Sequence, residues 1–290
     1  MRDFIIMTDS SCDLPAELAD ELELAVVPLH VMVKEKAFLN YLDWREIPCR
    51  NFFDLLRAGN RGQTSAPNLE QFTSAMEAIL QAGKDILYLG FSSALSGTYH
   101  AGTVAAEELR EKYPEATILT VDTLCASLGQ GMLVFLAVKE KRAGKTMEQV
   151  RDFVEEQKLH LCHWFTVDDL NYLKLGGRVS AAKAFLGTAL NIKPILHVDD
   201  EGRLTPVGKT KGRKQSFRKL AEHMKETGIN TKDQTIFISH GDCRQEAEEV
   251  ADILQAECGF RDVVIGPVGP VVGAHAGPGV MAIFFLGTHR

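Results

Sequence analysis

The sequence predicts an α/β protein of two domains: an N-terminal domain with a mainly parallel sheet in a three-layer arrangement, and a C-terminal α+β domain of a sheet with helices. In the first half, short apolar runs alternate with helical patterns, which implies crossover connections and parallel strands. In the second half, strands form hairpins beside amphipathic helices. With 290 residues and 45% hydrophobic side chains, the chain is large enough for two cores.

The N-terminal elements follow from short runs rich in Ile, Val and Leu and from apolar residues at helical spacing. The predicted strands cover residues 4–7, 25–33, 86–91 and 117–121. The predicted helices cover residues 14–23, 68–82, 98–112 and about 127–141. The apolar pattern ends near residues 142–144, so we expect domains at 1–145 and 146–290.

The C-terminal domain is expected to start with a polar helix that reaches about residue 159, because Thr146 and Gln149 supply a capping box. A hairpin turn is predicted at residues 199–202. The predicted strands cover 164–167, 194–198, 204–209 and 235–239, and the further helices about 214–227 and 244–258.

Residues 263–287 form a run of 25 residues with no charge apart from His275. A run of this length could cross a bilayer. Six glycines and three prolines inside it would break a membrane helix, however. We therefore expect two buried strands around a Gly/Pro turn that holds His275, and no transmembrane segment.

Composition limits the function classes and the cellular compartment. The 32 basic against 39 acidic residues give a net charge of −7, which argues against a general nucleic-acid binder. The six cysteines include no CxxC pair, as is typical of the cytoplasm. The first residues lack the apolar run of a signal peptide. His160, Cys162 and His163 have no matching second cluster, so we expect no metal site.

Hydroxyl side chains follow several predicted strands or precede a predicted helix. Because parallel strands end at one edge of a sheet, these side chains should lie close together. Helix N-termini at that edge offer N–H groups to a carboxylate or a phosphate. The alternative at each position is a simple N-cap. The residues concerned are Ser10, Thr64, Ser92 and Ser93.

Known catalytic motifs are incomplete. The segment around Ser92 and Ser93 lacks the second glycine of a nucleophile elbow, because Leu95 stands there. The Gly-Lys-Thr triplets at 144–146 and 208–210 lack the first glycine of a phosphate-binding loop. The enzyme alternative that stays open is a phosphotransferase or esterase acting on a small anionic substrate through Ser93 or His275.

Basic residues and one histidine suggest a site for an anion. His275 lies among small residues, so an accessible imidazole could meet an anionic head group; a core histidine is the alternative. Residues 208–219 hold six basic side chains and no acid, a strip that could dock a partner or simply face solvent. A regulatory module acting through this strip is a third alternative. Arg178 follows a pair of glycines that would end a helix.

Together these segments resemble the DegV family, whose members bind fatty acids. The resemblance runs in order from the first predicted strand to the last. Its motifs are TDSSCDLP at 8–15, TSAP at 64–67, SSALSGTY at 92–99, LKLGGR at 173–178 and the segment around His275.

The resemblance implies a long-chain fatty acid buried between the two domains. Its carboxylate would be held by Thr64, Ser92, Ser93 and His275. The protein would be a cytoplasmic lipid carrier without a catalytic site or cofactor of its own, in at most transient contact with a membrane surface. It would present the acid to a fatty acid kinase, which forms acyl-phosphate for phospholipid synthesis. Arg178 and Arg213 would contact the kinase or the acyl-phosphate.

Overall fold

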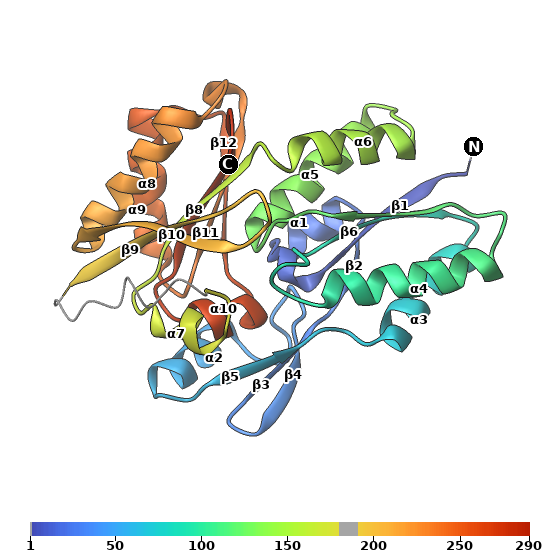
Figure 1. Ribbon diagram of the computed structural model, residues 1–290, viewed down its shortest axis with the longest axis horizontal. Helices are drawn as coiled ribbons and strands as arrows, with labels where there is room; N and C mark the ends of the chain where they lie inside the picture. Colours follow the sequence, from blue (N-terminus) through green and yellow to red (C-terminus); the bar gives the residue numbers. More distant parts are fainter. Residues whose placement is uncertain (1, 180–190) are drawn as a thin grey trace.

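Three β-sheets and the helices between them form the protein in this computed structural model, which describes residues 2–179 and 191–290 (Figure 1). Two larger sheets lie on either side of the molecule, and the third lies below them in the view of Figure 1. This mixed α/β arrangement confirms the predicted fold class.

The first sheet is parallel throughout and has the order β2-β1-β6-β7. Helices α3 and α4 cover one face, where Phe72, Met76 and Leu109 pack against Met7 and Tyr88. Helices α5 and α6 lie over the other face, which makes three layers as predicted. The strands are β1 (Phe4–Asp9), β2 (Ala25–Val27), β6 (Asp85–Gly90) and β7 (Ile118–Asp122), and the helices are α1 (Ala16–Glu21), α3 (Leu69–Gln81), α4 (Thr98–Lys112), α5 (Leu128–Arg142) and α6 (Met147–Gln157), with the 3-10 helix η1 (Ser10–Cys12) after β1.

The predicted domain boundary at 145/146 falls between α5 and α6. These two helices pack against each other, and α6 also contacts β7. The layer of helices on the first sheet therefore continues past residue 145. The domain boundary at this position stays a prediction.

The second sheet is mixed and has the order β10-β9-β8-β13-β11-β12, in which only the β11–β12 pair is parallel. Helices α8 and α9 cover one face, where Phe217, Leu220 and Leu254 are buried. This agrees with the predicted α+β character. The strands are β8 (Leu161–Thr166), β9 (Ile192–Val198), β10 (Leu204–Lys211), β11 (Thr235–His240), β12 (Asp262–Pro267) and β13 (Met281–Leu286), and the helices are α8 (Arg213–Thr227), α9 (Arg244–Glu257) and the 3-10 helix η3 (Thr231–Asp233).

A third, antiparallel sheet was not predicted. It consists of β4 (Lys36–Leu39), β3 (His30–Val33) and β5 (Gly62–Ser65), next to helix α2 (Cys49–Arg57). The single predicted strand over 25–33 is wrong, because it divides into β2 and β3, which pair in different sheets. The division falls at Pro28, which has no N–H for a ladder, and at Leu29, whose N–H donates to Ser10 Oγ (3.0 Å).

The run at 263–287 contains the two predicted strands, here β12 and β13, but the predicted turn between them is wrong. Helix α10 (Pro270–Ala276) occupies this position and carries His275 in its last turn. Pro270 fits the first helical position because no intrahelical partner is lost there. Gly277 ends the helix at φ 79°, a conformation that favours glycine.

No helix in residues 2–179 or 191–290 combines the length and the apolar character needed to cross a membrane.

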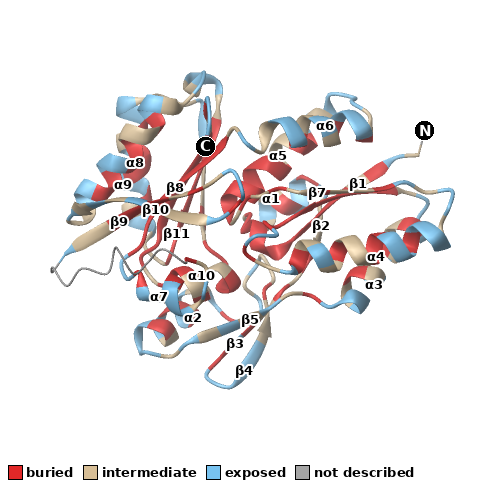
Figure 2. Ribbon diagram, viewed as in Figure 1, coloured by how far each residue is buried: buried red, intermediate tan, exposed pale blue. Residues whose placement is uncertain are grey.

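Helix α5 lies between the two larger sheets (Figure 1) and is buried on nearly all sides over its first two turns (Figure 2). It packs against β1 and β6 on one side and against β8, β11 and β13 on the other. Two glycines permit this close approach. A Cβ on Gly129 would lie 2.1 Å from His163 Nε2, and one on Gly131 would lie 2.7 Å from the Cys12 carbonyl oxygen.

The substitution Gly131→Ala tests this close packing. Alanine normally stabilises a helix by about 1 kcal/mol over glycine. Here we expect a net loss of about 1–3 kcal/mol, because the methyl group meets a backbone oxygen that cannot rotate away. Gly97→Ala, whose Cβ meets nothing within 4 Å, is the control. Urea unfolding measures both variants, and a stabilised G131A would show that α5 is not tightly enclosed.

Candidate functional site

A cavity opens where all three sheets meet. About 870 Å³ of space not filled by protein atoms lies within it, counting the part open to solvent. Its walls are mainly apolar and come from strands of the second sheet, from loops that follow the strands of the first sheet, from β5 and from α10. They include Leu29, Leu95, Phe165, Val198, Val272 and Phe284.

One polar end of the cavity is formed by Thr64 and His275. Thr64 lies in β5 opposite Val31 of β3, so the third sheet fixes its position. Its Oγ1 is 2.8 Å from His275 Nε2 of α10. The structure thus brings together two predicted site residues that are 211 positions apart in the chain.

His275 is held in its neutral form. Burial lowers the pKa of its imidazole to about 4, and the positive charge of Arg178 contributes to this shift. Its Nδ1 is buried and has no hydrogen-bond partner. If Nε2–H donates to Thr64, the threonine proton is left to donate to a ligand.

Arg178 also lines the cavity. Its Nε donates to the Leu95 carbonyl (3.2 Å) and its Nη1 to the Gly176 carbonyl (2.5 Å). The first bond ties the segment after α7 (Asn171–Leu175) to the loop between β6 and α4. The hydrogen bond to the Gly176 carbonyl lies beside His275, since a Cβ on Gly176 would be 2.4 Å from His275 Nδ1. Arg178 therefore brings a guanidinium to the Thr64–His275 end.

Ser96 is the serine of this loop that faces the cavity, and the sequence analysis missed it. Its Oγ is 2.8 Å from Thr98 Oγ1, and its N–H donates to the Ser92 carbonyl (3.2 Å). It follows Leu95, which is bonded to Arg178, so it belongs to the same end of the cavity. The only signal in the sequence was a third serine within the 92–99 motif.

Ser92 and Ser93 do not line the cavity. Ser92 is fully buried, and its hydroxyl donates to the Gly202 carbonyl (2.8 Å), which connects the β6–α4 loop to the β9–β10 turn. Ser93 is exposed, and its N–H donates to Asp122 (3.2 Å). Their predicted contact with a carboxylate stays a prediction, and in this structure they shape the turn that presents Ser96.

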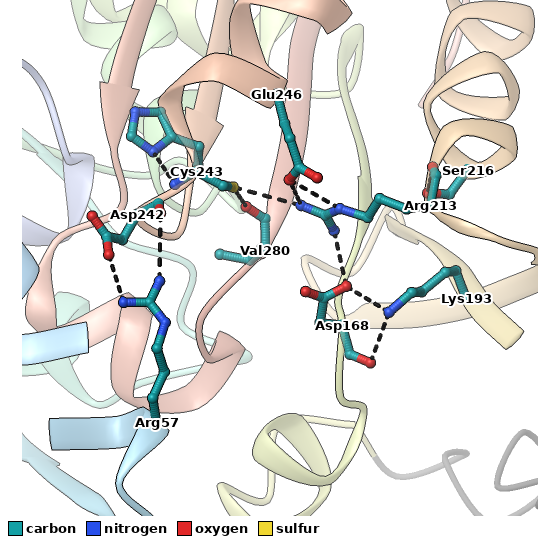
Figure 3. Close-up of polar contacts among 10 residues, drawn as sticks. Arg57, Asp168, Lys193, Arg213, Ser216, Asp242, Cys243, Glu246 and Val280 are labelled. Atoms are coloured by element: carbon teal, nitrogen blue, oxygen red, sulfur yellow. Dashed lines mark hydrogen bonds and ion pairs between the residues drawn. The ribbon is translucent and has the colours of Figure 1, made fainter. Parts of the chain in front are cut away.

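Arg213 lies outside the cavity, within a group of charged side chains (Figure 3). Its Nη2 bonds Glu246 (2.6 Å) and its Nη1 bonds Asp168 (3.3 Å). Lys193 bonds the same Asp168 carboxylate (2.5 Å). The basic strip is therefore partly neutralised by acids distant in sequence.

The geometry of this end suits binding of an anion. His275 Nδ1, the nitrogen that a third group would orient in an activated base, has no hydrogen-bond partner. Thr64, Ser96 and Arg178 are hydrogen-bond donors next to an apolar cavity. Among the described residues, no group of three His, Cys, Asp or Glu side chains could hold a metal ion.

Known proteins share the sequence pattern and the fold of this chain. The sequence pattern of the DegV family, described as uncharacterised proteins, matches residues 3–288. The chain belongs to the DegV family. A DegV domain-containing protein of Clostridium perfringens is 42% identical over 290 residues, covering 100% of this chain and 99% of that protein.

Two solved DegV structures have the same fold. A DegV lipid-binding protein from Thermotoga maritima is 27% identical, with a TM-score of 0.88 and 99% of both chains covered. A fatty-acid-binding DegV protein from Thermus thermophilus is 30% identical, with a TM-score of 0.87, covering 98% of this chain and 99% of that one. The family predicted from the sequence motifs is thus confirmed.

The neutral state of His275 can be tested by NMR. We expect its ring signals to titrate only near pH 4, because burial and Arg178 oppose protonation. The substitution Arg178→Gln should raise the pKa toward its usual 6.5, whereas Arg61→Gln, at an exposed position outside the cavity, should not.

Since the folded-state pKa is below the unfolded one, this residue should also make the protein less stable as pH falls from about 6.5 to 4. Titration of His275 near pH 6.5 in the unliganded protein would contradict the burial of its ring.

Proposed function

We propose that this DegV protein binds a long-chain fatty acid in the cavity and presents it to a fatty acid kinase. The observation that carries the proposal is the Thr64–His275 pair at one end of an otherwise mainly apolar cavity. The carboxylate lies against Thr64, His275 and Ser96, and the acyl chain runs between Phe165, Val272 and Phe284.

The free energies of burial support a lipid ligand. A chain of about 15 methylenes gains roughly 12 kcal/mol on leaving water, at about 0.8 kcal/mol for each CH₂. A carboxylate cannot be buried without partners. The Thr64–His275 pair has one proton left after its own hydrogen bond, Ser96 supplies another, and Arg178 supplies a positive charge beside them. The solved relatives described as lipid-binding or fatty-acid-binding have the same fold.

The proposed kinase step uses the same end of the cavity. A carboxylate oxygen attacks the γ-phosphorus of ATP held by the kinase; the bond to the ADP oxygen breaks, and acyl-phosphate forms. Arg178 balances the added negative charge. Leu175, which is 58% exposed on α7, lies three residues from Arg178 and offers an apolar contact for the kinase. Arg213 supports this face through its ion pairs with Asp168 and Glu246.

The proposal places the protein in the cytoplasm, where the kinase and ATP would be. The six cysteines are all free thiols, which fits a reducing compartment.

Mass spectrometry of a denatured extract tests the binding step. We expect about one fatty acid per purified protein. Thr64→Val and Ser96→Ala should each weaken binding about 10- to 100-fold, because each removes a hydrogen bond to a charged group. Ala126→Phe should block the cavity, while Ala94→Phe, at an exposed position outside it, should not. Repeated preparations without fatty acid would count against the proposal.

The kinase step is tested with ATP, a bacterial fatty acid kinase and the loaded protein, trapping acyl-phosphate with hydroxylamine. Arg178→Gln should slow product formation at least tenfold when the rate is compared at equal amounts of loaded protein, and Arg61→Gln should not. No acyl-phosphate with several kinases would refute presentation. Product from the DegV protein and ATP alone would instead identify a phosphotransferase.

A further inference from the structure

A second polar region interrupts the apolar wall of the cavity away from Thr64 and His275. It contains three serines, each at most 5% exposed: Ser11 of η1, Ser127 just before α5 and Ser239 of β11. They come from different elements and meet where the first turn of α5 packs against η1 and β11. Nothing in the carboxylate site uses them.

The hydroxyl groups of this region, here called the serine subsite, have unused hydrogen-bonding capacity. Ser127 Oγ is 2.6 Å from Asp13 Oδ2 and 3.3 Å from Ser239 Oγ. Ser11 Oγ is fully buried and makes no hydrogen bond of normal geometry, although its hydroxyl lies near enough to Asp9 to act on the pKa of that carboxyl, in the lowering direction. A buried hydroxyl without a partner costs about 1–3 kcal/mol. The subsite is therefore complete only when a polar group in the cavity bonds to Ser11.

His163 lines the same part of the cavity but does not supply that partner. Its Nδ1 is 3.0 Å from the Leu161 carbonyl oxygen, and its Nε2 accepts from the Ala126 N–H (3.3 Å). Burial keeps the pKa of the ring well below its usual value, so it is neutral. Both ring nitrogens are thus occupied, and the serines are left as the groups available to a ligand.

Helix α10 gives the position of the serine subsite along the cavity. One face of the helix and the residue before its N-cap line the cavity along its length: Val268, Val271, Val272, His275 and Ala276. At its N-terminus, a Cβ on Gly269 would lie 2.6 Å from Oδ1 of Asp13, the residue bonded to Ser127. His275 comes six residues later, about 9 Å along a helix axis. An extended hydrocarbon chain covers this distance in about seven or eight bonds.

We infer that the serine subsite binds a hydroxyl group in the middle of an acyl chain, so that the cavity accepts mid-chain hydroxy fatty acids as well as unsubstituted ones. This inference rests on the proposed fatty-acid-binding function and specifies its ligand class. Counted from carbon 1, seven or eight bonds lead to carbon 8 or 9 beside Gly269, and the serines lie one hydrogen bond further, beyond Asp13. A hydroxyl at carbon 9 or 10 of a chain whose carboxylate lies at Thr64 and His275 therefore reaches Ser11 and Ser239. It both donates and accepts there, as the buried serines require.

Competition binding with stearic acid and with its 3-hydroxy and 10-hydroxy derivatives tests the inference. In an apolar tunnel, a buried hydroxyl without a partner would weaken binding about 10- to 100-fold. We expect that penalty for the 3-hydroxy acid, whereas the 10-hydroxy acid should bind within threefold of stearic acid or more tightly.

Ser11→Ala and Ser239→Ala should weaken binding of the 10-hydroxy acid at least tenfold and leave stearic acid unchanged. The matched control is Thr166→Val, which removes another fully buried hydroxyl without a partner, one that does not line the cavity. Thermal melting confirms that each variant is folded. If an alanine variant is not folded, the glycine substitution at the same position, Ser11→Gly or Ser239→Gly, replaces it.

Two results would overturn the inference while leaving the proposed function intact. One is tight binding of stearic acid with a tenfold or greater loss for the 10-hydroxy acid. The other is a crystal structure with the 10-hydroxy acid in which water alone contacts the three serines. Failure to bind stearic acid at all would instead refute the proposed function.

Discussion

The enclosure of α5 between two sheets is the constraint on which the rest of the structure depends. A helix buried on all sides must be apolar all round or have its polar groups satisfied. The one amide in its first turns, Gln130, donates from Nε2 to Thr8 Oγ1 (2.9 Å) and Asp9 Oδ2 (3.1 Å) of β1, while its buried Oε1 makes no hydrogen bond. Gly129 and Gly131 remove the side chains that would hold the sheets apart. The cavity begins at the N-terminus of this helix, so its shape follows from the same packing.

Helix α10 connects that core to the third sheet and to the binding end of the cavity. Its N-terminus lies against Asp13, whose burial raises the pKa of its carboxyl to about 8. Its C-terminal turn brings His275 to Thr64. Gly273 lets the helix pack closely on Phe52 and Phe53 of α2. One short helix thus sets the separation of the two polar regions of the cavity.

The charged side chains near the proposed carboxylate site favour an anionic ligand but do not hold it in a buried ion pair. Arg213 and Lys193 are paired with carboxylates outside the cavity (Figure 3). Among the described residues, the cation that lines the cavity is Arg178, and it bonds backbone carbonyl oxygens. With His275 neutral, a carboxylate meets mainly neutral donors. Under the proposed function, a carboxylate oxygen that is not locked in a buried ion pair stays available to attack the γ-phosphorus of ATP.

The sequence by itself predicted most strands and helices of the two larger sheets, though not the separate β2, and the DegV family, because these depend on local periodicity and short motifs. It also predicted Thr64 and His275 as site residues, and the structure brings these two side chains within 2.8 Å of each other. Only the tertiary structure decided the third sheet, because the sequence of β5 (GQTS) has no strand-like pattern. The helix that carries His275 was also not predicted, because its segment is rich in glycine and proline, which are rare inside helices. It also showed Ser96, rather than Ser92 or Ser93, lining the cavity. Which of several adjacent serines faces a cavity depends on contacts with residues far away in the chain, such as Gly202, and these leave no local signal.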